Sequence, residues 1–304
     1  VGDTIRAVLG IRGEPEVPDE PDKGRVWTSI TQLVDTPGTE NEYISVADIK
    51  RSTVAKHPWS LQGGAAAPLK ERVENCAQGR LETEVGIVAV PGTDDALFLA
   101  PHVNGRRNLT HVAPLVVGDL VRDYSLARPI PSLFPYSDSG AIIPFADLPA
   151  PERMWLWPRR ASLGSNRWFG KDKWERSAPW HGWAFVAFDK LDRPLSISFA
   201  FVATHNHFVF DRGGKIFKQS APVIKLDETA TEEEHLQLLG LLNSSVACFW
   251  MKQVFYPKGG DPMGSDGARL SVAPWSDRYE FDGTKLKQFP VAKGSVLPFA
   301  KALD

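Results

Sequence analysis

The chain has 304 residues, of which 42% are hydrophobic, and its formal net charge is −2. This length allows one large core or two modest ones. No run of eighteen apolar residues occurs and the N-terminus does not resemble a signal peptide, so we expect no membrane span. Cys76 and Cys248 are the only cysteines, which excludes a disulfide framework or a multi-cysteine zinc site and fits a cytoplasmic location.

The near-zero net charge does not favour nucleic-acid binding by the chain as a whole. A DNA-binding function therefore has to rest on local basic patches. The sequence begins with Val1 rather than Met, and the apolar residues 5–11 follow directly. We therefore expect a piece of a longer protein.

Two helices are predicted in the first hundred residues. Val26, Ile30 and Val34 recur at helical spacing. Pro68 suits the first turn of a second helix, and Gly79 suits its C-terminal cap.

A hairpin and a domain boundary are predicted next. Residues 85–90 and 96–99 flank a turn-rich stretch and predict two paired strands. We place a soft boundary near residues 104–108. Residues 1–108 would then form a small mixed α/β subdomain, and residues 109–304 a second domain.

The stretch from Pro194 to Val254 organises the rest of the predicted fold. Apolar and small residues alternate from Leu195 to Phe201, which is typical of a strand with one buried face. Residues 206–210 and 215–218 flank Gly213 and Gly214. Because glycine tolerates positive φ, this pattern predicts a hairpin.

A strand at 222–226 and a helix complete this stretch. Thr231 and Glu234 have the spacing of a capping box. Behind them, apolar residues at steps of three, four and three predict one helix with a buried stripe: Leu239, Leu242, Val246 and Phe249. The fold class is therefore α/β in the α+β sense, a mixed, mostly antiparallel sheet with packed helices and many loops.

The strongest local charge signal is the basic segment, which we define as residues 153–176. Its seven Arg and Lys residues against two acidic ones leave a local charge of +5. Tryptophan and phenylalanine are interleaved with these cations. Arg and Lys neutralise phosphates, Arg can read guanine, and Asn can read adenine. The alternative is a solvated loop surface that tryptophans anchor to the core.

A second basic patch is predicted at residues 211–219, which contain Arg212, Lys215 and Lys218. A glycine at the tip of a hairpin lets the backbone approach a phosphate closely, although the patch could equally be an ordinary exposed turn. The glycine-rich residues 258–269 could also close over a phosphate, but a flexible surface loop is the preferred interpretation.

Neither a metal site nor an active site is predicted. His205 and His207 flank Asn206, and no carboxylate or cysteine cluster stands near them in the sequence. The sequence contains no Pro-Pro pair and no Walker-type or Gly-x-Ser-x-Gly motif. We therefore expect no catalysis by this chain alone.

Several segments resemble the C-terminal target-recognition region of TaqI-like adenine-specific DNA methyltransferases, in the PglX branch of bacteriophage-exclusion systems. The similarity is carried by LLGLLNSS at 238–245 and by the run FAFVATHNHFVFDRGGKIFKQSAPVIKL at 199–226. It extends to VVGDLVRDY at 116–124, WPRRASLGSNRWFGKDKW at 157–174, GIRGEP at 10–15 and AKHPWS at 55–60.

The resemblance implies a division of labour. A catalytic domain upstream of Val1 would bind S-adenosylmethionine and methylate adenine N6, while this chain would recognise double-stranded DNA. The glycine-rich cofactor turn and the Asn/Asp-Pro-Pro-aromatic loop of such enzymes are absent here. The DNA-contacting residues expected on these grounds are Arg159, Arg160, Asn166, Arg167, Trp168, Lys171, Lys173, Arg212, Lys215 and Lys218, with Asn166 and Arg167 as base readers.

The alternative is a protein-interaction module. Near-neutral charge and ten tryptophans suit an interface with other phage-exclusion proteins or with a phage-encoded inhibitor. No set of catalytic residues in the sequence supports a third alternative, a free-standing enzyme of another class.

Overall fold

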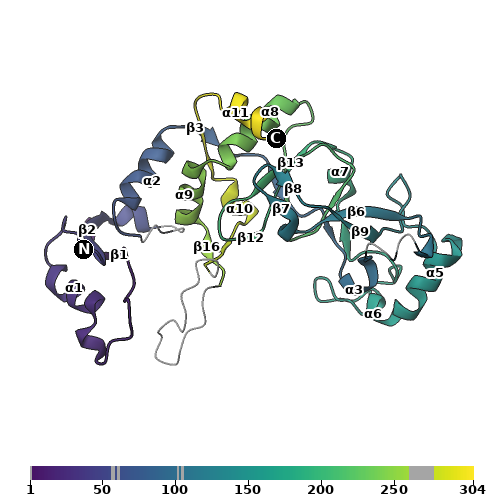
Figure 1. Ribbon diagram of the computed structural model, residues 1–304, viewed down its shortest axis with the longest axis horizontal. Coiled ribbons are helices and arrows are strands. Elements are labelled where there is room, and N and C mark those ends of the chain that lie inside the picture. The colour runs from purple at the N-terminus through teal and green to yellow at the C-terminus, as the bar shows by residue number, and fades with distance from the viewer. Residues whose placement is uncertain (1, 56–58, 60–61, 101–102, 104–105, 260–276) are drawn as a thin grey trace. The chain divides into compact units, whose positions relative to one another are not determined.

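The computed structural model describes residues 2–55, 59, 62–100, 103, 106–259 and 277–304 (Figure 1). The chain divides into two compact units. Unit 1 comprises Val1–Leu81 and Ser244–Gly294, and unit 2 comprises Glu82–Asn243 and Ser295–Asp304. This division differs from the expected one at residue 108, because strand pairing joins segments that lie far apart in the sequence.

Unit 1 contains a long antiparallel ladder. β1 (Thr4–Gly10) pairs along its whole length with β2 (Ile44–Lys50). The first predicted helix is confirmed as α1 (Arg25–Leu33). The other elements of this unit are η1 (Pro21–Lys23), η2 (Arg51–Val54), α2 (Ala66–Asn75), β3 (Ala77–Arg80), α9 (Ser245–Val254), β16 (Tyr256–Pro257), β17 (Tyr279–Glu280), α10 (Gly283–Leu286) and β18 (Pro290–Ala292).

The helix predicted from Pro68 is confirmed as α2, but its C-terminal cap is not Gly79. The helix ends at Asn75 with Cys76 as its C-cap, and Gly79 lies in β3, where it pairs with Val291 of β18. The β3–β18 pairing joins the two sequence segments of unit 1. α2 also contacts α9, where the Trp250 indole donates to Glu74 at 3.0 Å.

Unit 2 is built around a four-stranded antiparallel sheet. Its strand order is β13 (Phe208–Asp211), β11 (Ser196–Phe199), β15 (Val223–Lys225) and β4 (Glu84–Gly86). Every residue of β11, β13 and β15 is buried. The strand predicted at 195–201 is therefore confirmed, but the expectation of a single buried face is wrong, since Ser196 and Ser198 are also enclosed.

The hairpin predicted around Gly213 and Gly214 does not form. Both glycines adopt positive φ, at 100° and 77°, as expected. However, β14 (Ile216–Phe217) leaves β13 and pairs in parallel with β6 (Val112–Val116), which is antiparallel to β9 (Ile130–Leu133). The turn thus connects two sheets, because β14 pairs with β6 rather than with β13.

The first predicted hairpin is also wrong. β5 (Ala89–Val90) is followed by α3 (Asp94–Leu97), and β5 pairs instead with β10 (Phe185–Val186). The remaining elements of unit 2 are η3 (Gly118–Leu120), β7 (Val121–Arg122), β8 (Ser125–Leu126), η4 (Phe145–Asp147), α5 (Ala150–Leu156), η5 (Trp157–Arg159), α6 (Arg160–Gly164), α7 (Phe188–Leu191), β12 (Val202–Ala203), α8 (Glu232–Leu242) and α11 (Leu297–Leu303).

One hydrophobic core joins the strands and short helices of unit 2. Side chains from α3, β6, β9, α5 and α6 contribute fully buried leucines to it: Leu97, Leu115, Leu133, Leu156 and Leu163. Figure 1 shows α3, α5 and α6 grouped near β6 and β9. Within the described part of the chain, no helix has the length and apolar content that a membrane span requires.

The capping box is confirmed, but the prediction of a single helix behind it is wrong. Thr231 Oγ1 accepts from the Glu234 amide, and the Glu234 carboxylate accepts from the Thr231 amide at 2.7 Å. The helix breaks after Asn243, whose side chain bonds the backbone of Phe208, and Ser244 caps α9 anew. Val246, expected on the buried stripe, is 56% exposed.

We predict that Thr231→Ala lowers the free energy of unfolding by about 0.5–2 kcal/mol, because it removes the acceptor of the capping box. Urea unfolding followed by circular dichroism measures this loss. Glu228→Gln, which changes an exposed residue just before the helix, is the control and should change stability by less than about 0.5 kcal/mol. Equal effects of the two substitutions would contradict the capping role.

Candidate nucleic-acid interface

The basic segment begins on α5, which is anchored to the core of unit 2. Pro149 and Pro151 suit the entry and first turn of this helix. Trp155 is 9% exposed, and its indole donates to the Ala96 carbonyl at 2.8 Å. Pro158 lacks an amide proton, and the chain continues as η5 and α6. These anchors fix where the following loop starts.

Arg159 and Arg160 lie differently although they are adjacent. The Arg159 guanidinium lies 3.8 Å from the centre of the Trp155 ring and donates to the Trp155 carbonyl at 2.7 Å. Burial lowers the pKa of Arg159. Arg160 is exposed and lies 4.5 Å from the centre of Trp157, which is 51% exposed. Of the two, Arg160 is the better placed to meet a ligand from solvent.

A tight turn at residues 168–171 presents an aromatic side chain. Trp168 and Lys171 are bridged, and the two residues between them, Phe169 and Gly170, have positive φ of 49° and 78°. Positive φ is unfavourable for a bulky residue such as phenylalanine. Phe169 is nevertheless 84% exposed. The turn therefore holds a large apolar ring out in solvent.

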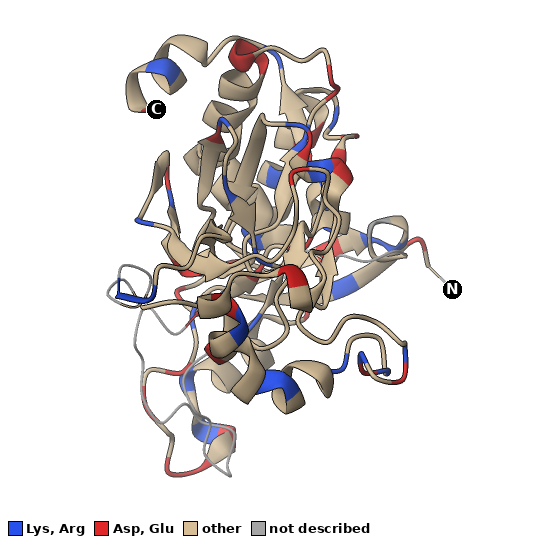
Figure 2. Cartoon of the chain, turned by 90° about the vertical axis from the view of Figure 1, so that its right-hand side faces the viewer, with Lys and Arg blue, Asp and Glu red and all other residues tan. Residues whose placement is uncertain are grey.

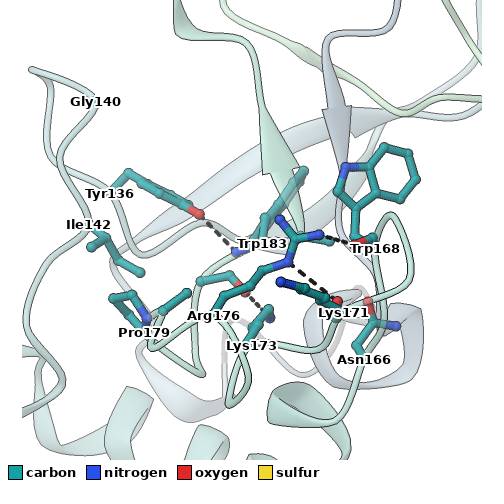
Figure 3. Close-up of a pocket in the computed structure, with 13 residues that line it drawn as sticks. Tyr136, Gly140, Ile142, Asn166, Trp168, Lys171, Lys173, Arg176, Pro179 and Trp183 are labelled. Carbon is teal, nitrogen blue, oxygen red and sulfur yellow. Dashed lines mark hydrogen bonds between the residues drawn. The ribbon is translucent and has the colours of Figure 1, made fainter.

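Behind this turn lies a cavity of about 290 Å³ (Figure 3). Its lining combines aromatic and cationic side chains and contains no carboxylate among the residues that form it: Tyr136, Gly140, Ile142, Asn166, Trp168, Lys171, Lys173, Arg176, Ala178, Pro179, Gly182, Trp183 and Ala184. Burial raises the pKa of Tyr136 to about 12, and its hydroxyl accepts from the Trp183 amide at 2.8 Å. The cavity is suited to an anionic or aromatic ligand.

The placement of Lys173 conflicts with its expected contact to DNA. Lys173 is 5% exposed, and its ammonium donates to the carbonyls of Trp180, at 3.2 Å, and Gly182. Burial lowers its pKa to about 8. Lys173 therefore stabilises the loop from within, whereas Lys171 is exposed.

The two expected base readers, Asn166 and Arg167, also differ in how accessible their side chains are. The Asn166 side chain donates to the Gly92 carbonyl at 2.7 Å, and Gly92 has a φ of 92°. A Cβ at Gly92 would meet the Asn166 oxygen, so the two residues are closely packed. Arg167 has a 66% exposed side chain and only a loose contact to Glu175 at 4.0 Å. Asn166 has a structural partner, whereas Arg167 remains accessible.

The cations of the second patch are paired within the chain. Arg212 contacts Glu232 and Asp304, the latter at 2.7 Å. Lys215 contacts Asp211 at 2.5 Å, and Lys218 contacts Asp94. Figure 2 shows positive and negative residues interspersed over much of the view. These pairs reduce the positive charge that the patch could offer to a phosphate.

The charged side chains that line the cavity behind the turn are Lys171, Lys173 and Arg176, so the cavity offers no carboxylate to the positive sulfonium of S-adenosylmethionine. The other loop considered from the sequence, from Gly260 to Arg269, lies outside the described residues, as does most of the 55–60 motif.

Phe169 is the functional candidate that the sequence interpretation missed. It was one of several interleaved aromatics, and nothing in that composition separates it from buried tryptophans. The Phe169-Gly170 dipeptide before a lysine is a turn signal that could have singled it out. Trp174 has a structural role instead, because its half-exposed ring covers Gly164, where a Cβ would collide with it.

We predict that the burial of Lys173 makes stability depend on pH. Because its folded pKa of about 8 is below its ordinary value, the unfolded chain binds more protons above pH 8, and stability rises with pH up to about 10.4. Burial lowers the pKa of Lys225 to about 8 as well. Since these two lysines contribute about equally, Lys173→Met should remove about half of the gain in stability between pH 8 and pH 10.4.

Urea unfolding at a series of pH values between 7 and 10.5 measures this gain. Lys171→Met is the matched control and should retain it in full, because Lys171 is exposed. If Lys173→Met kept the same pH dependence as the unaltered chain, the ammonium would not be buried as described.

Comparison with known proteins supplies the context for this interface. No protein-family model matches the chain. The chain is 43% identical over 310 aligned residues to the adenine-specific methyltransferase PglX of Streptomyces coelicolor, which covers 99% of this chain and 25% of the relative. It thus spans about a quarter of the length of the curated relative that it matches.

Two restriction enzymes have weakly similar structures. The type IIL restriction-modification enzyme MmeI, solved in complex with DNA, is 15% identical with a TM-score of 0.47, covering 74% of this chain and 27% of the enzyme. The type IIG restriction endonuclease BpuSI is 10% identical with a TM-score of 0.45, and the match covers 99% of this chain and 34% of the endonuclease. These low scores do not establish a shared fold. The sequence match confirms the resemblance, and the chain corresponds to one region of a PglX-like protein.

Proposed function

We propose that this chain is the DNA target-recognition region of an adenine-specific DNA methyltransferase. The observation that carries the proposal is the exposed part of the basic segment, which presents Arg160, Arg167 and Lys171 to solvent together with the protruding Phe169. Duplex DNA offers phosphates to such cations and base faces to such a ring. The 43% identity to a methyltransferase named as adenine-specific supports this assignment.

The roles within this surface follow from accessibility. Arg160 and Lys171 would contact phosphates, because both are exposed. Arg167 would read a base, since an accessible guanidinium can bond guanine in the major groove with about 1–3 kcal/mol of discrimination. Phe169 would stack on a base or wedge between base pairs. Arg159, Asn166, Trp168 and Lys173 would support these residues from behind.

The remaining parts of the activity belong to the rest of the longer protein. A catalytic domain outside this chain would bind S-adenosylmethionine and methylate adenine, and this chain would pack against it. Methylation would mark host DNA as self in a phage-exclusion system that acts in the cytoplasm. Other exclusion proteins or a phage inhibitor would be additional partners.

A protein-interaction module is the second candidate. It is favoured by large exposed apolar side chains close to one another in sequence: Met154 is 70% exposed and Trp157 51%. An interface of this kind would depend little on salt, whereas DNA binding weakens steeply as salt rises. Salt dependence therefore separates the two functions.

We predict salt-dependent binding of the chain to short unmethylated duplexes. Replacing Arg160, Arg167 and Lys171 together with alanine should reduce the slope of log affinity against log salt by about 2, since the two lost phosphate contacts, of Arg160 and Lys171, contribute about 0.9 each. Fluorescence anisotropy across a salt series measures the slope. Arg167→Ala alone should also lose preference among competing duplex sequences.

The paired cations of the second patch provide the matched control. Replacing Arg212 and Lys215 with glutamine should leave the slope nearly unchanged, because carboxylates of the chain already neutralise them. A larger effect of this double variant than of the triple variant would move the interface to the second patch. Salt-independent association with a protein partner, and none with DNA, would favour the interaction module.

We predict that Phe169→Ala weakens DNA binding about 5- to 150-fold, because stacking on one base contributes about 1–3 kcal/mol. The same anisotropy assay measures this loss. Phe299→Ala is the control, since Phe299 is 72% exposed on α11 and lies outside the basic segment. Comparable affinities of the two variants would remove Phe169 from the interface.

A further inference from the structure

A second side-chain cluster in unit 2 lies apart from the basic segment. Asp123, His205 and His207 each offer a ligand atom, and these atoms lie within 4.8 Å of one another. His207 Nδ1 is 2.7 Å from Asp123 Oδ1, and the two imidazole rings are 4.1 Å apart between centroids. Residue spacing does not reveal this carboxylate, because Asp123 lies 84 positions before His207.

The backbone on the histidine side is fixed independently of the cluster. Asn206, between the two histidines, is 4% exposed and donates to the Leu242 carbonyl at 2.6 Å. The Asn243 side chain accepts from the Phe208 amide at 3.0 Å and donates to the Phe208 carbonyl at 2.9 Å. These bonds hold the segment before β13 so that both histidine rings lie side by side.

The backbone on the aspartate side is held by a strained turn. Asp123 and Tyr124 connect β7 to β8, and Tyr124 has a positive φ of 57°. The Tyr124 amide donates to the Phe208 carbonyl at 3.0 Å, which places Asp123 beside His207. Such strain persists where the surroundings enforce it, often at ligand sites.

We propose that Asp123, His205 and His207 bind one divalent transition-metal ion of the zinc class. Two imidazoles and one carboxylate are ligands that Zn²⁺, Co²⁺ and Ni²⁺ accept, whereas Mg²⁺ and Ca²⁺ prefer oxygen alone. The carboxylate offsets part of the ion's charge. Three protein ligands leave a coordination position for water, as in open zinc sites.

The observed spacing needs only a small adjustment to reach metal-binding geometry. Ligand atoms about 2.1 Å from a tetrahedral ion are about 3.4 Å from one another. The longest separation in the cluster would therefore shorten by at most about 1.4 Å, which side-chain rotation can supply. Asp123 is 45% exposed at its side chain, so an ion can reach it from solvent.

A contact of Thr204 with His205, outside the three ligands, also supports metal binding. Thr204 Oγ1 lies 3.0 Å from His205 Nδ1. Where this hydroxyl accepts the Nδ1 proton, Nε2 carries the lone pair that a metal requires. Contacts of this kind orient a ligating imidazole and increase its basicity.

Isothermal titration of the chelator-treated chain with ZnCl₂ tests the proposal. We expect saturable binding of one equivalent, and a visible Co²⁺ absorption spectrum typical of nitrogen and oxygen ligands. His205→Ala and His207→Ala should each abolish the binding. Asp123→Asn, which keeps the size of the side chain, should weaken it, and circular dichroism checks that every variant is folded.

Two controls make the outcome decisive. His111 contacts the buried carboxylate of Glu152 at 2.7 Å, so His111→Gln alters a simple histidine–carboxylate pair and should keep one equivalent of zinc bound. Cys76→Ser removes the exposed thiol and should also leave binding unchanged. Absence of saturable zinc binding, or binding that survives in the cluster variants, would overturn the proposal.

Discussion

The irregular part of the basic segment depends on one buried ammonium. Residues 172–184, which include the end of this segment and the loop after it, form no helix or strand, so their carbonyls need donors from outside a regular ladder. Lys173 donates to the carbonyls of Trp180 and Gly182, and its own amide donates to Gly164. An ammonium has three protons and no acceptor, which suits the closure of such a loop. With Lys173 turned inward, the chain presents Lys171 and Phe169 to solvent.

Charge pairing decides which cations are available on a chain that is nearly neutral. Arg212, Lys215 and Lys218 are each held by carboxylates of unit 2, while Arg160 and Lys171 are exposed. A phosphate competing for a paired cation must first displace the carboxylate, whereas an exposed cation only releases water. The composition of a patch is therefore a weaker guide to DNA binding than the partners of its side chains.

The break between α8 and α9 lets the side chain of Asn243 bond to the neighbouring sheet. Asn243 ends α8 and uses its side-chain amide to bond both backbone groups of Phe208 at the start of β13. The same residue of β13 accepts from the Tyr124 amide. A continuous helix, as the apolar spacing alone indicates, would carry the Asn243 amide onward and leave Phe208 without these bonds. The arrangement of Asp123 and His207 thus depends on a helix end far from both in sequence.

Local patterns in the sequence determined the elements whose causes are local. The capping box at Thr231, the helix at Pro68 and the positive φ of Gly213 and Gly214 follow from neighbouring residues and are present as expected. The resemblance to the PglX branch likewise needed only the sequence. Tertiary structure alone decided that β14 pairs with β6, that Lys173 is buried, and that Asp123 meets the two histidines. Strand partners and side-chain environments are set by segments distant in the chain. The spacing of residues within one segment does not indicate them.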